Sequence, residues 1–489
     1  IYCGSSLVFY YCDRVTHSMA CGKLEKHFNP TLGFQYLQPC NSTAIKVKSI
    51  LAPFKLTVDQ ISRMWDSFSQ EMTRGLQKNP IAPACIQMEN TYVTDIPNGM
   101  EKGDYLAIDL GGTNFRVFYC VVNEGRIVKE DLEHFEVPNA LRKGQSEKLF
   151  DFLADSVLKF TDLRNLNDRP ISLGFTFSFP IHQEALDRAV LLSWAMAFTC
   201  PNAVGNDVVQ LLRDAFDRRG NTNIHVAGLI NDSTGTLIYG AFLKSNCAVG
   251  TILGSGTNAC YVEAIDNVEK WGGSKAAVRE VLINTEWGQL GDNGCLDFIR
   301  TDVDDEIDRE SCHPGKFMLE RYLGGNFIGD IVRRIMLKMC SEGLLLEGTL
   351  HPKLREMGSI PAAFVSEVEK DSIEGSMERT RFLLSDFHEI CSDEDVSIVK
   401  EICYVVSERV ALLFAAVLSC LLLKIGRTDI SIAVDGSLYE CHPRLHTMIT
   451  FFVQSMLPQL NFELFLAKDG SGKGGALVAA VVDRKRNHE

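Results

Sequence analysis

The tripeptide Gly-Thr-Asn occurs twice in this chain, and each copy lies at the bend of a strand–turn–strand pattern. The first copy is residues 112–114 and the second is residues 256–258. Apolar alternation on both sides of a glycine-rich bend is typical of a β-hairpin. Glycine permits positive φ and close approach of a ligand, so the N–H groups of each turn can form a nest for an anion. The duplication therefore predicts two related halves whose turns hold a polyphosphate between them.

Strands alternate with helices along the rest of the chain, which is the pattern of the α/β class. Thr57 is predicted to cap a helix, with Gln60 as its capping-box partner, because the apolar residues that follow recur on one helical face. We expect two similar α/β halves that face each other across a cleft. The other predicted elements are helices over 146–160 and 206–219, strands over 171–180, 224–230 and 430–437, a helix-rich half over 290–425, and a glycine turn over 469–475 that leads into an apolar segment over 476–482.

Composition excludes several classes of function. The 489 residues are 46% hydrophobic and 23% charged, which is typical of a globular protein with a full core. Although the formal net charge is −14, the sequence has no Lys/Arg block of the kind that binds nucleic acid or an anionic membrane. The apolar run 410–423 is shorter than the roughly 20 residues that span a bilayer. We therefore expect it to be a buried core helix.

Cysteine and histidine usage predicts no structural transition metal. The 16 cysteines lie in apolar runs and form no CxxC pair, so we expect free buried thiols rather than disulfides or a zinc site. The 11 histidines likewise indicate no such metal. This usage indicates a reducing compartment, and we expect a cytoplasmic protein. Residues 1–45 lack the basic region and the apolar length of a signal peptide, and are expected to be a poorly ordered extension.

Two polar clusters are candidate sites. The apolar run 224–230 ends in Asn231 and Asp232, where a helix is expected to begin. Either Asp232 or Ser233 merely caps that helix, or Asp232 is a carboxylate base that faces the cleft, with Asn231 and Asn258 binding hydroxyl groups beside it. Glu286 lies in a neutral polar loop that suits bidentate hydrogen bonding to sugar hydroxyls, although a plain turn is equally compatible with this sequence.

Glycines and hydroxyl residues recur in four turns, at 111–114, 254–258, 435–437 and 470–475. The last of them opens a helix, whose free N–H groups and positive dipole end favour a phosphate. Lys473 in this segment is not in the frame of a P-loop, so that motif is excluded. The four turns are therefore candidate phosphate contacts.

Seven motifs, in this order, resemble those of the hexokinases. They are IDLGGTNFRV (108–117), GFTFSFP (174–180), NDS (231–233), GSGTNACY (254–261), NTEWG (284–288), VDGSLY (434–439) and GSGKG (470–474). The resemblance covers about residues 50–485 and a single kinase unit rather than the tandem form. It implies the two-lobed actin-like ATPase (ribonuclease H-like) fold with a ligand cleft between the lobes. The implied large lobe is 46–96 plus 232–474, and the small lobe is 97–231 plus 475–489.

The resemblance also implies an activity and its site residues. A hexokinase would use ATP and Mg²⁺ to phosphorylate a hexose, with glucose favoured, at its 6-hydroxyl in the first step of glycolysis. Asp232 would be the base, and Asp109 would hold Mg²⁺ through water. The implied hexose-binding residues are Ser178, Asn231, Asp232, Asn258, Glu286 and Glu320. The implied nucleotide-binding residues are Asp109, Gly111, Gly112, Thr113, Asn114, Arg116, Gly254, Ser255, Gly256, Thr257, Gly436, Ser437 and Gly472.

One position departs from the family pattern. Where the family usually has Thr-Lys after a tryptophan, this chain has Ala195-Met196 after Trp194. The implied loss is a sugar hydrogen bond and a cation beside the transferring phosphoryl group, so binding is expected to survive better than turnover.

Two other functions are therefore compatible with the sequence. A catalytically weakened sugar-binding or regulatory protein is the main alternative, and the Ala195-Met196 pair favours it. An actin-like assembly protein ranks below it, because such a protein has no need of the hydroxyl-binding set. The only partners expected are the hexose and Mg·ATP, with no nucleic acid, no transmembrane segment and no mitochondrial association indicated. The chain is expected to be a monomer or a weak homodimer.

Overall fold

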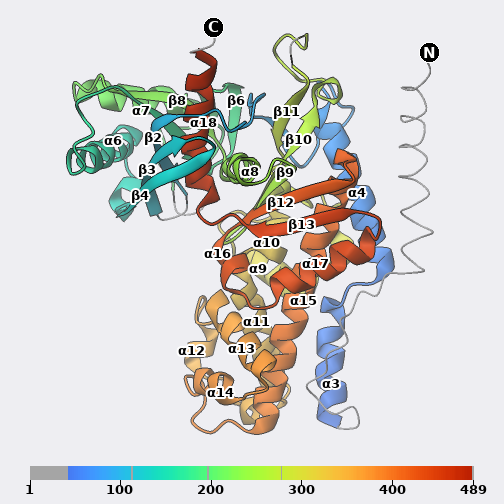
Figure 1. Cartoon of the computed structure of the whole chain (residues 1–489). Coiled ribbons are helices and arrows are strands. Elements are labelled where there is room, and N and C mark those ends of the chain that lie inside the picture. Colours follow the sequence, from blue (N-terminus) through green and yellow to red (C-terminus); the bar gives the residue numbers. More distant parts are fainter. Residues whose placement is uncertain (1–41, 112–113, 195–197, 277, 487–489) are drawn as a thin grey trace, which may run out of the picture.

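Two β-sheets form the upper part of the molecule in Figure 1, and they share the same strand order and strand directions apart from one extra edge strand in the second. The computed structural model describes residues 42–111, 114–194, 198–276 and 278–486. In each sheet three successive strands pair antiparallel, and two later strands add in parallel beside the first of them. The predictions of an α/β class and of two related halves are confirmed.

The first sheet has the order β4-β3-β2-β5-β8, and the second has the order β1-β11-β10-β9-β12-β13. Both glycine-rich bends are antiparallel hairpins, formed by β2 with β3 and by β9 with β10. The strands of the first sheet are β2 (Gly103–Leu110), β3 (Asn114–Asn123), β4 (Arg126–Glu136), β5 (Ile171–Phe177) and β8 (Ile224–Ile230). Those of the second are β1 (Glu89–Asn90), β9 (Cys247–Leu253), β10 (Thr257–Ala264), β11 (Glu280–Asn284), β12 (Asp429–Asp435) and β13 (Asn461–Leu466).

The first sheet has an apolar core of its own on one face. That core is built from its strands and from α6 (Ser146–Asp162) and α7 (Val208–Arg218), both close to their predicted positions. The remaining elements of this region are α5 (Asn139–Arg142) and the hairpin of β6 (Ile181–Ala185) and β7 (Arg188–Leu191). Strands β5 and β8 are buried in this core, so the residues that follow their ends lie at its edge.

Helices α8 (Asp232–Leu243) and α18 (Gly470–Arg486) lie side by side between the two sheets (Figure 1). Each follows the last strand of one sheet and packs on the other: α8 packs on β9 and β12, whereas α18 packs on β2 and β5. They approach so closely that a Cβ added at Gly474 would lie 2.0 Å from the Gly235 carbonyl oxygen. The predicted glycine turn over 469–475 is therefore wrong, because α18 begins at Gly470 and its glycines allow backbone contact.

The helix-rich half predicted over 290–425 is confirmed, and it lies below the second sheet in Figure 1. Its long central helix, α15 (Asp393–Ile425), has the length and apolar composition of a membrane span, and its most apolar window is entirely buried. The run predicted as a core helix is thus part of a longer one, because a capping box at Ser392 starts it earlier. The other helices that follow the second hairpin are α9 (Asp302–Glu310), α10 (Met318–Leu323), α11 (Gly325–Ser341), α12 (Pro352–Arg355), α13 (Ala362–Glu374), α14 (Glu378–Leu384), α16 (Ser437–Cys441) and α17 (Leu445–Met456), with short 3-10 turns η2 (Ile265–Asn267), η3 (Trp287–Gln289), η4 (Asp297–Ile299) and η5 (Leu346–Gly348).

The N-terminal part of the described chain packs on α15. It consists of α3 (Ser42–Leu51), the turn η1 (Ala52–Phe54) and α4 (Val58–Leu76). Residues 42–45 therefore belong to a helix and not to the predicted extension, while residues 1–41 lie outside the described part. The predicted capping box is confirmed, since Gln60 N donates to Thr57 Oγ1 at 3.3 Å and Thr57 N donates to Gln60 Oε1 at 2.9 Å. The cysteines that the structure describes are free thiols, as predicted.

Candidate active site

Asp232 follows the end of strand β8 and is the first residue of α8. The cap of this helix is Asn231, whose Oδ1 accepts a hydrogen bond from Ser233 N at 2.9 Å. The sequence-based alternative in which Asp232 or Ser233 is the cap is therefore wrong. Asp232 Oδ1 accepts a bond of 2.7 Å from the same Ser233 N, which holds the carboxyl group at the positive end of the helix dipole.

The surroundings of Asp232 favour its protonated form. Burial raises the pKa of this carboxyl to about 7, and the negative charges of Glu286 and Asp109 contribute to the rise. Hydrogen bonds from Ser233 N and from the Ser178 hydroxyl oppose it. A carboxylate with a pKa near neutrality is suited to accept a proton from an alcohol in a transition state. The structure thus brings predicted residues Ser178 and Asp232 together.

An amide and carboxylate cluster lies next to Asp232. The Nδ2 group of Asn258 is within hydrogen-bond distance of Asn231 Oδ1 (3.0 Å), Asn284 Oδ1 (2.9 Å) and Glu286 Oε1 (3.4 Å). Asn284 Nδ2 donates to the same Glu286 oxygen at 2.8 Å. Glu286 has left-handed backbone angles (φ 51°, ψ 43°), which turn the chain immediately after strand β11. Neutral amides that hold a carboxylate in place give a surface of acceptors and donors suited to sugar hydroxyls.

Glu320 joins this cluster from helix α10. Thr257 N donates to its Oε2 at 3.3 Å, so the second hairpin turn holds the carboxylate. Burial raises the pKa of Glu320 to about 7, and the charges of Glu286 and Asp292 add to the rise. Asp292 also positions α10, because its Oδ1 accepts a bond from Met318 N at 3.1 Å. Three carboxyl groups, those of Asp232, Glu286 and Glu320, therefore share one partly buried region.

The contact between Gly256 and Glu320 gives a testable prediction. A Cβ added at Gly256 would lie 2.2 Å from Glu320 Oε2, so Gly256→Ala should displace that carboxylate. If Glu320 binds a hexose, as the resemblance implies, the hexose Kd, measured by calorimetry without nucleotide, should rise at least tenfold. The matched control is Gly111→Ala in the first turn, where an added Cβ meets nothing closer than 3.8 Å. Equal hexose affinities of the two variants would contradict the assignment of Glu320 to the hexose site.

A second polar network surrounds Asp109, near the end of strand β2. Arg116 on β3 forms ion pairs with Asp109 and, at 2.9 Å, with Asp469. Ser471 Oγ donates to Asp109 Oδ2 at 2.8 Å, and Ser471 N donates to Asp435 Oδ2 at 3.2 Å. The predicted residues Asp109 and Arg116 are therefore brought together, and the first turn of α18 joins them.

The second hairpin turn meets the turn after β12. A Cβ added at Gly254 would lie 3.2 Å from Gly436 Cα, which has φ 123°. Ser255 and Ser437 are both exposed in these adjoining turns. These four predicted nucleotide-binding residues therefore lie close together on the two turns.

Two predicted nucleotide contacts differ from expectation. The Thr257 hydroxyl donates to Ile252 O and accepts from Trp287 Nε1, both at 3.0 Å, so it is used inside the hairpin rather than as a donor in the nest. Gly472 is buried, and a Cβ added there would lie 2.1 Å from the ring of Phe118. Its lack of a side chain is required by helix packing.

Some predicted positions lie outside the described residues. These are Gly112 and Thr113 in the first hairpin turn, and Ala195 and Met196. Asn114 is described only through its backbone, as the first residue of β3. Trp194 and Phe198, which flank the Ala-Met pair, stack with ring centroids 5.4 Å apart. Both ends of that segment are therefore anchored in the core of the first sheet.

Sequence reasoning did not assign Asn284 or Asp469 to the site, and it included Asp435 and Ser471 only as members of the candidate phosphate turns 435–437 and 470–475. Asn284 lies two residues before the predicted carboxylate Glu286, and Asp435 begins the predicted turn 435–437, so both had a signal in the sequence. Asp469 and Ser471 had none beyond their glycine-rich surroundings, because their role depends on the packing of α18 against the first sheet.

Comparisons with known proteins agree with the geometry. Two family models, both described as hexokinase, match residues 46–242 and 248–481. The chain is 36% identical over 446 residues to Hexokinase HKDC1 of Homo sapiens and 36% identical over 449 residues to Hexokinase-1 of Rattus norvegicus. Each match covers 90% of this chain and 48% of the relative, so the chain spans about half the length of the curated relatives it matches.

Two solved structures have the same fold. A hexokinase from Schistosoma mansoni complexed with glucose is 36% identical, with a TM-score of 0.83 over 89% of this chain and 98% of that one. A second structure, described as a hexokinase, is 28% identical, with a TM-score of 0.77 over 90% of this chain and 100% of that one. The two-lobed α/β fold inferred from the duplicated hairpins is that of these proteins.

Proposed function

This chain belongs to the hexokinase family, and we propose that it transfers the γ-phosphoryl group of ATP to the 6-hydroxyl of a hexose. The observation that carries the proposal is Asp232, a carboxyl with a pKa of about 7 beside a cluster of amides and carboxylates. Glucose is the favoured substrate, and the reaction would be the first step of glycolysis. The lobes would be residues 46–96 plus 232–474 and residues 97–231 plus 475–489, with the ligands between them.

Asp232 acts as the general base in this proposal. Its carboxylate accepts the proton of the hexose 6-hydroxyl as the oxygen attacks the γ-phosphorus in line. Ser178 holds the carboxyl group by a hydrogen bond, and Ser233 N fixes the oxygen Oδ1 at 2.7 Å. Asn231, Asn258, Glu286 and Glu320 bind the other hydroxyls and so position the attacking oxygen, on which phosphoryl transfer mainly depends.

The Asp109 network fits a nucleotide with Mg²⁺. Its carboxylates are hard oxygen donors of the kind that Mg²⁺ prefers, and Asp109 is held by Arg116 and Ser471. Bound Mg²⁺ would neutralise charge on the phosphate oxygens. Asp109 would contact it through water, while the exposed turns at Ser255 and Ser437 contact the nucleotide. Arg116 would balance the charge of Asp109 and Asp469 when nucleotide is absent.

The direct test is a coupled assay for glucose 6-phosphate at saturating Mg·ATP, with glucose binding measured in parallel. Turnover that requires both substrates is expected. Glucose binding without measurable turnover would instead favour the second candidate function, a sugar-binding or regulatory protein, which the Ala195-Met196 pair supports. We further propose a cytoplasmic monomer or weak homodimer, and sedimentation of the purified chain tests the oligomeric part.

The pH dependence of kcat/KM follows from the raised pKa of Asp232. The base must be ionised to accept a proton, and a pKa of about 7 leaves it mostly protonated at pH 6. We expect kcat/KM to fall about tenfold for each pH unit below 7 and to level off above it. Because Glu286 interacts with both Asp232 and Glu320, the apparent pKa belongs to the whole cluster. A flat profile between pH 5 and 8, with the protein folded throughout, would exclude Asp232 as the base.

A further inference from the structure

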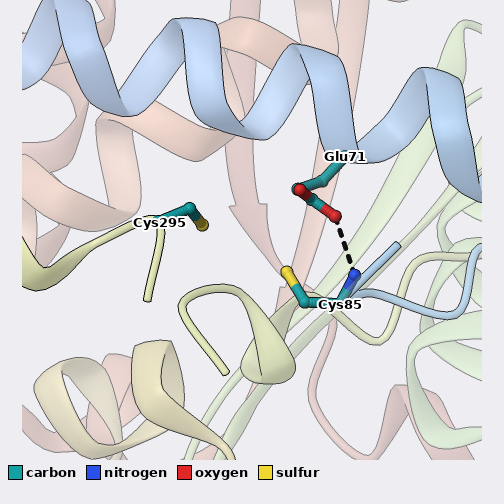
Figure 2. Close-up of side chains that lie close together, drawn as sticks. All are labelled: Glu71, Cys85 and Cys295. Atoms are coloured by element: carbon teal, nitrogen blue, oxygen red, sulfur yellow. Dashed lines mark hydrogen bonds between the residues drawn. The ribbon is translucent and has the colours of Figure 1, made fainter. Parts of the chain in front are cut away.

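Three potential metal ligands converge outside the site described above (Figure 2). Glu71 lies on α4, Cys85 lies in the segment before β1, and Cys295 lies in the loop between η3 and η4. Figure 2 shows the carboxylate and the two thiols directed toward one another, and their ligand atoms all lie within 4.8 Å of one another. We propose that these three side chains bind a soft divalent cation of the Zn²⁺ type, with water as the fourth ligand.

The geometry of the three residues is close to that of a tetrahedral zinc site. With Zn–S of about 2.3 Å and Zn–O of about 2.0 Å, neighbouring ligand atoms lie roughly 3.3–3.8 Å apart. Atoms already within 4.8 Å reach those separations by shifts of about 1 Å, which cysteine side chains can make by small rotations. Three protein ligands and one water are the usual set of an accessible zinc site, and both cysteines are only partly buried here.

Hydrogen bonds orient the carboxylate for this role. Glu71 is 1% exposed; its Oε2 accepts a bond of 2.7 Å from Cys85 N, and its Oε1 accepts one of 3.0 Å from Asn293 Nδ2. Each carboxylate oxygen has two lone pairs, so Oε2 keeps one for a metal. Such fixing of a ligand by neighbouring donors is typical of metal sites.

The charges also balance. Two thiolates and one carboxylate around a divalent cation leave a net charge of −1. Arg74, whose Nη1 lies 2.8 Å from Glu71 Oε1, neutralises it. An uncompensated charge in this partly buried position would be costly, so the arginine favours the loaded state.

A bound cation would connect the site to the hexose cluster. Cys295 ends the loop that starts at Glu286 and includes Asp292, and Met88 N, three residues after Cys85, donates to Thr285 O at 3.2 Å. The cation would therefore join α4 to the segment that carries the predicted hexose contact Glu286. We expect it to stabilise that loop against local opening.

The experiment is titration of the reduced 489-residue chain with Zn²⁺ in competition with a chromophoric chelator. We expect one tightly bound equivalent in the unmodified protein, its loss in Cys85→Ser and Cys295→Ser, and a Kd at least tenfold higher in Glu71→Gln. The matched control is Cys312→Ser, which removes an exposed thiol and should leave that equivalent unchanged. X-ray absorption of the loaded unmodified protein should show two sulfur ligands at about 2.3 Å.

Three results would overturn the proposal. They are no tight equivalent in the reduced protein, an equivalent that persists in Cys295→Ser, or a zinc environment without two sulfur atoms. The absorption measurement needs no variant, so it remains decisive if a substitution prevents folding.

Discussion

Replacing Asp232 by asparagine should lower kcat by about 10²–10⁴-fold while hexose binding is largely retained. The change removes the proton acceptor, and a general base contributes a factor of this size. Asparagine keeps an oxygen that can accept the bonds from Ser233 N and from the Ser178 hydroxyl, so the start of α8 should not change. The measurements are kcat from the coupled assay and the hexose Kd from calorimetry. A folded variant with unchanged kcat would contradict the mechanism.

Stability provides the control for this variant. The pKa of Asp232 rises from 3.8 to about 7 on folding, so the fold favours the protonated carboxyl. The stability that this preference contributes is present below pH 4 and is lost as the pH rises through 7. Asparagine does not ionise, so at pH 8 the free energy of unfolding of the variant should exceed that of the unmodified protein, by roughly 1–4 kcal/mol. Denaturant titrations should therefore show a more stable variant at pH 8, and this gain in the free energy of unfolding should be absent near pH 4.

Replacing Met196 by lysine, together with Ala195→Thr, should raise kcat/KM. A methionine fills space but cannot stabilise charge that develops on the γ-phosphoryl or sugar oxygens. Recovery of one positioned donor is worth at most about 3–4 kcal/mol, so up to roughly 10³-fold is the ceiling. Met196→Lys alone should act mainly on kcat, because the charge it stabilises exists only in the transition state. Steady-state kinetics of the single and double variants test this.

A second substitution at Met196 is the control for the lysine variant. Residues 195–197 lie outside the described part. Trp194, which precedes them, donates from Nε1 to Cys200 O at 2.6 Å, so its side chain is held in place. Met196→Gln introduces a polar group without a charge and should give a much smaller gain. An unmodified protein that already turns over rapidly, or a folded Met196→Lys variant of lower activity, would show that another group replaces the lysine of the family.

Local signals predicted much of the fold correctly. The bounds of β8 follow from an apolar run between polar residues, and the start of α4 follows from a capping box at Thr57. Both hairpins were predicted because glycine-rich bends and alternation are determined by neighbouring residues. The amide and carboxylate cluster beside Asp232 contains Asn231, Asn258 and Glu286, which the sequence singled out at strand ends and which the fold brings to adjacent edges.

The remaining errors arise where packing overrides local preference. Glycine in a helix costs about 1 kcal/mol relative to alanine, so a segment with four glycines in six residues predicts a turn. The close approach of α8 to α18 reverses that preference, because any side chain at Gly474 would meet the backbone at Gly235. Long-range pairs such as Cys85 and Cys295 likewise have no signal in sequence spacing, because only the folded chain brings them together.

The exchange of α8 and α18 between the sheets makes the two halves mutually dependent for folding. A cut at the 244–246 loop, between the two family matches, would leave each fragment with a terminal helix whose partner strands are in the other fragment. Each fragment alone would expose the faces that α8 and α18 normally cover, so neither should fold by itself. Mixed together, the fragments should reassociate.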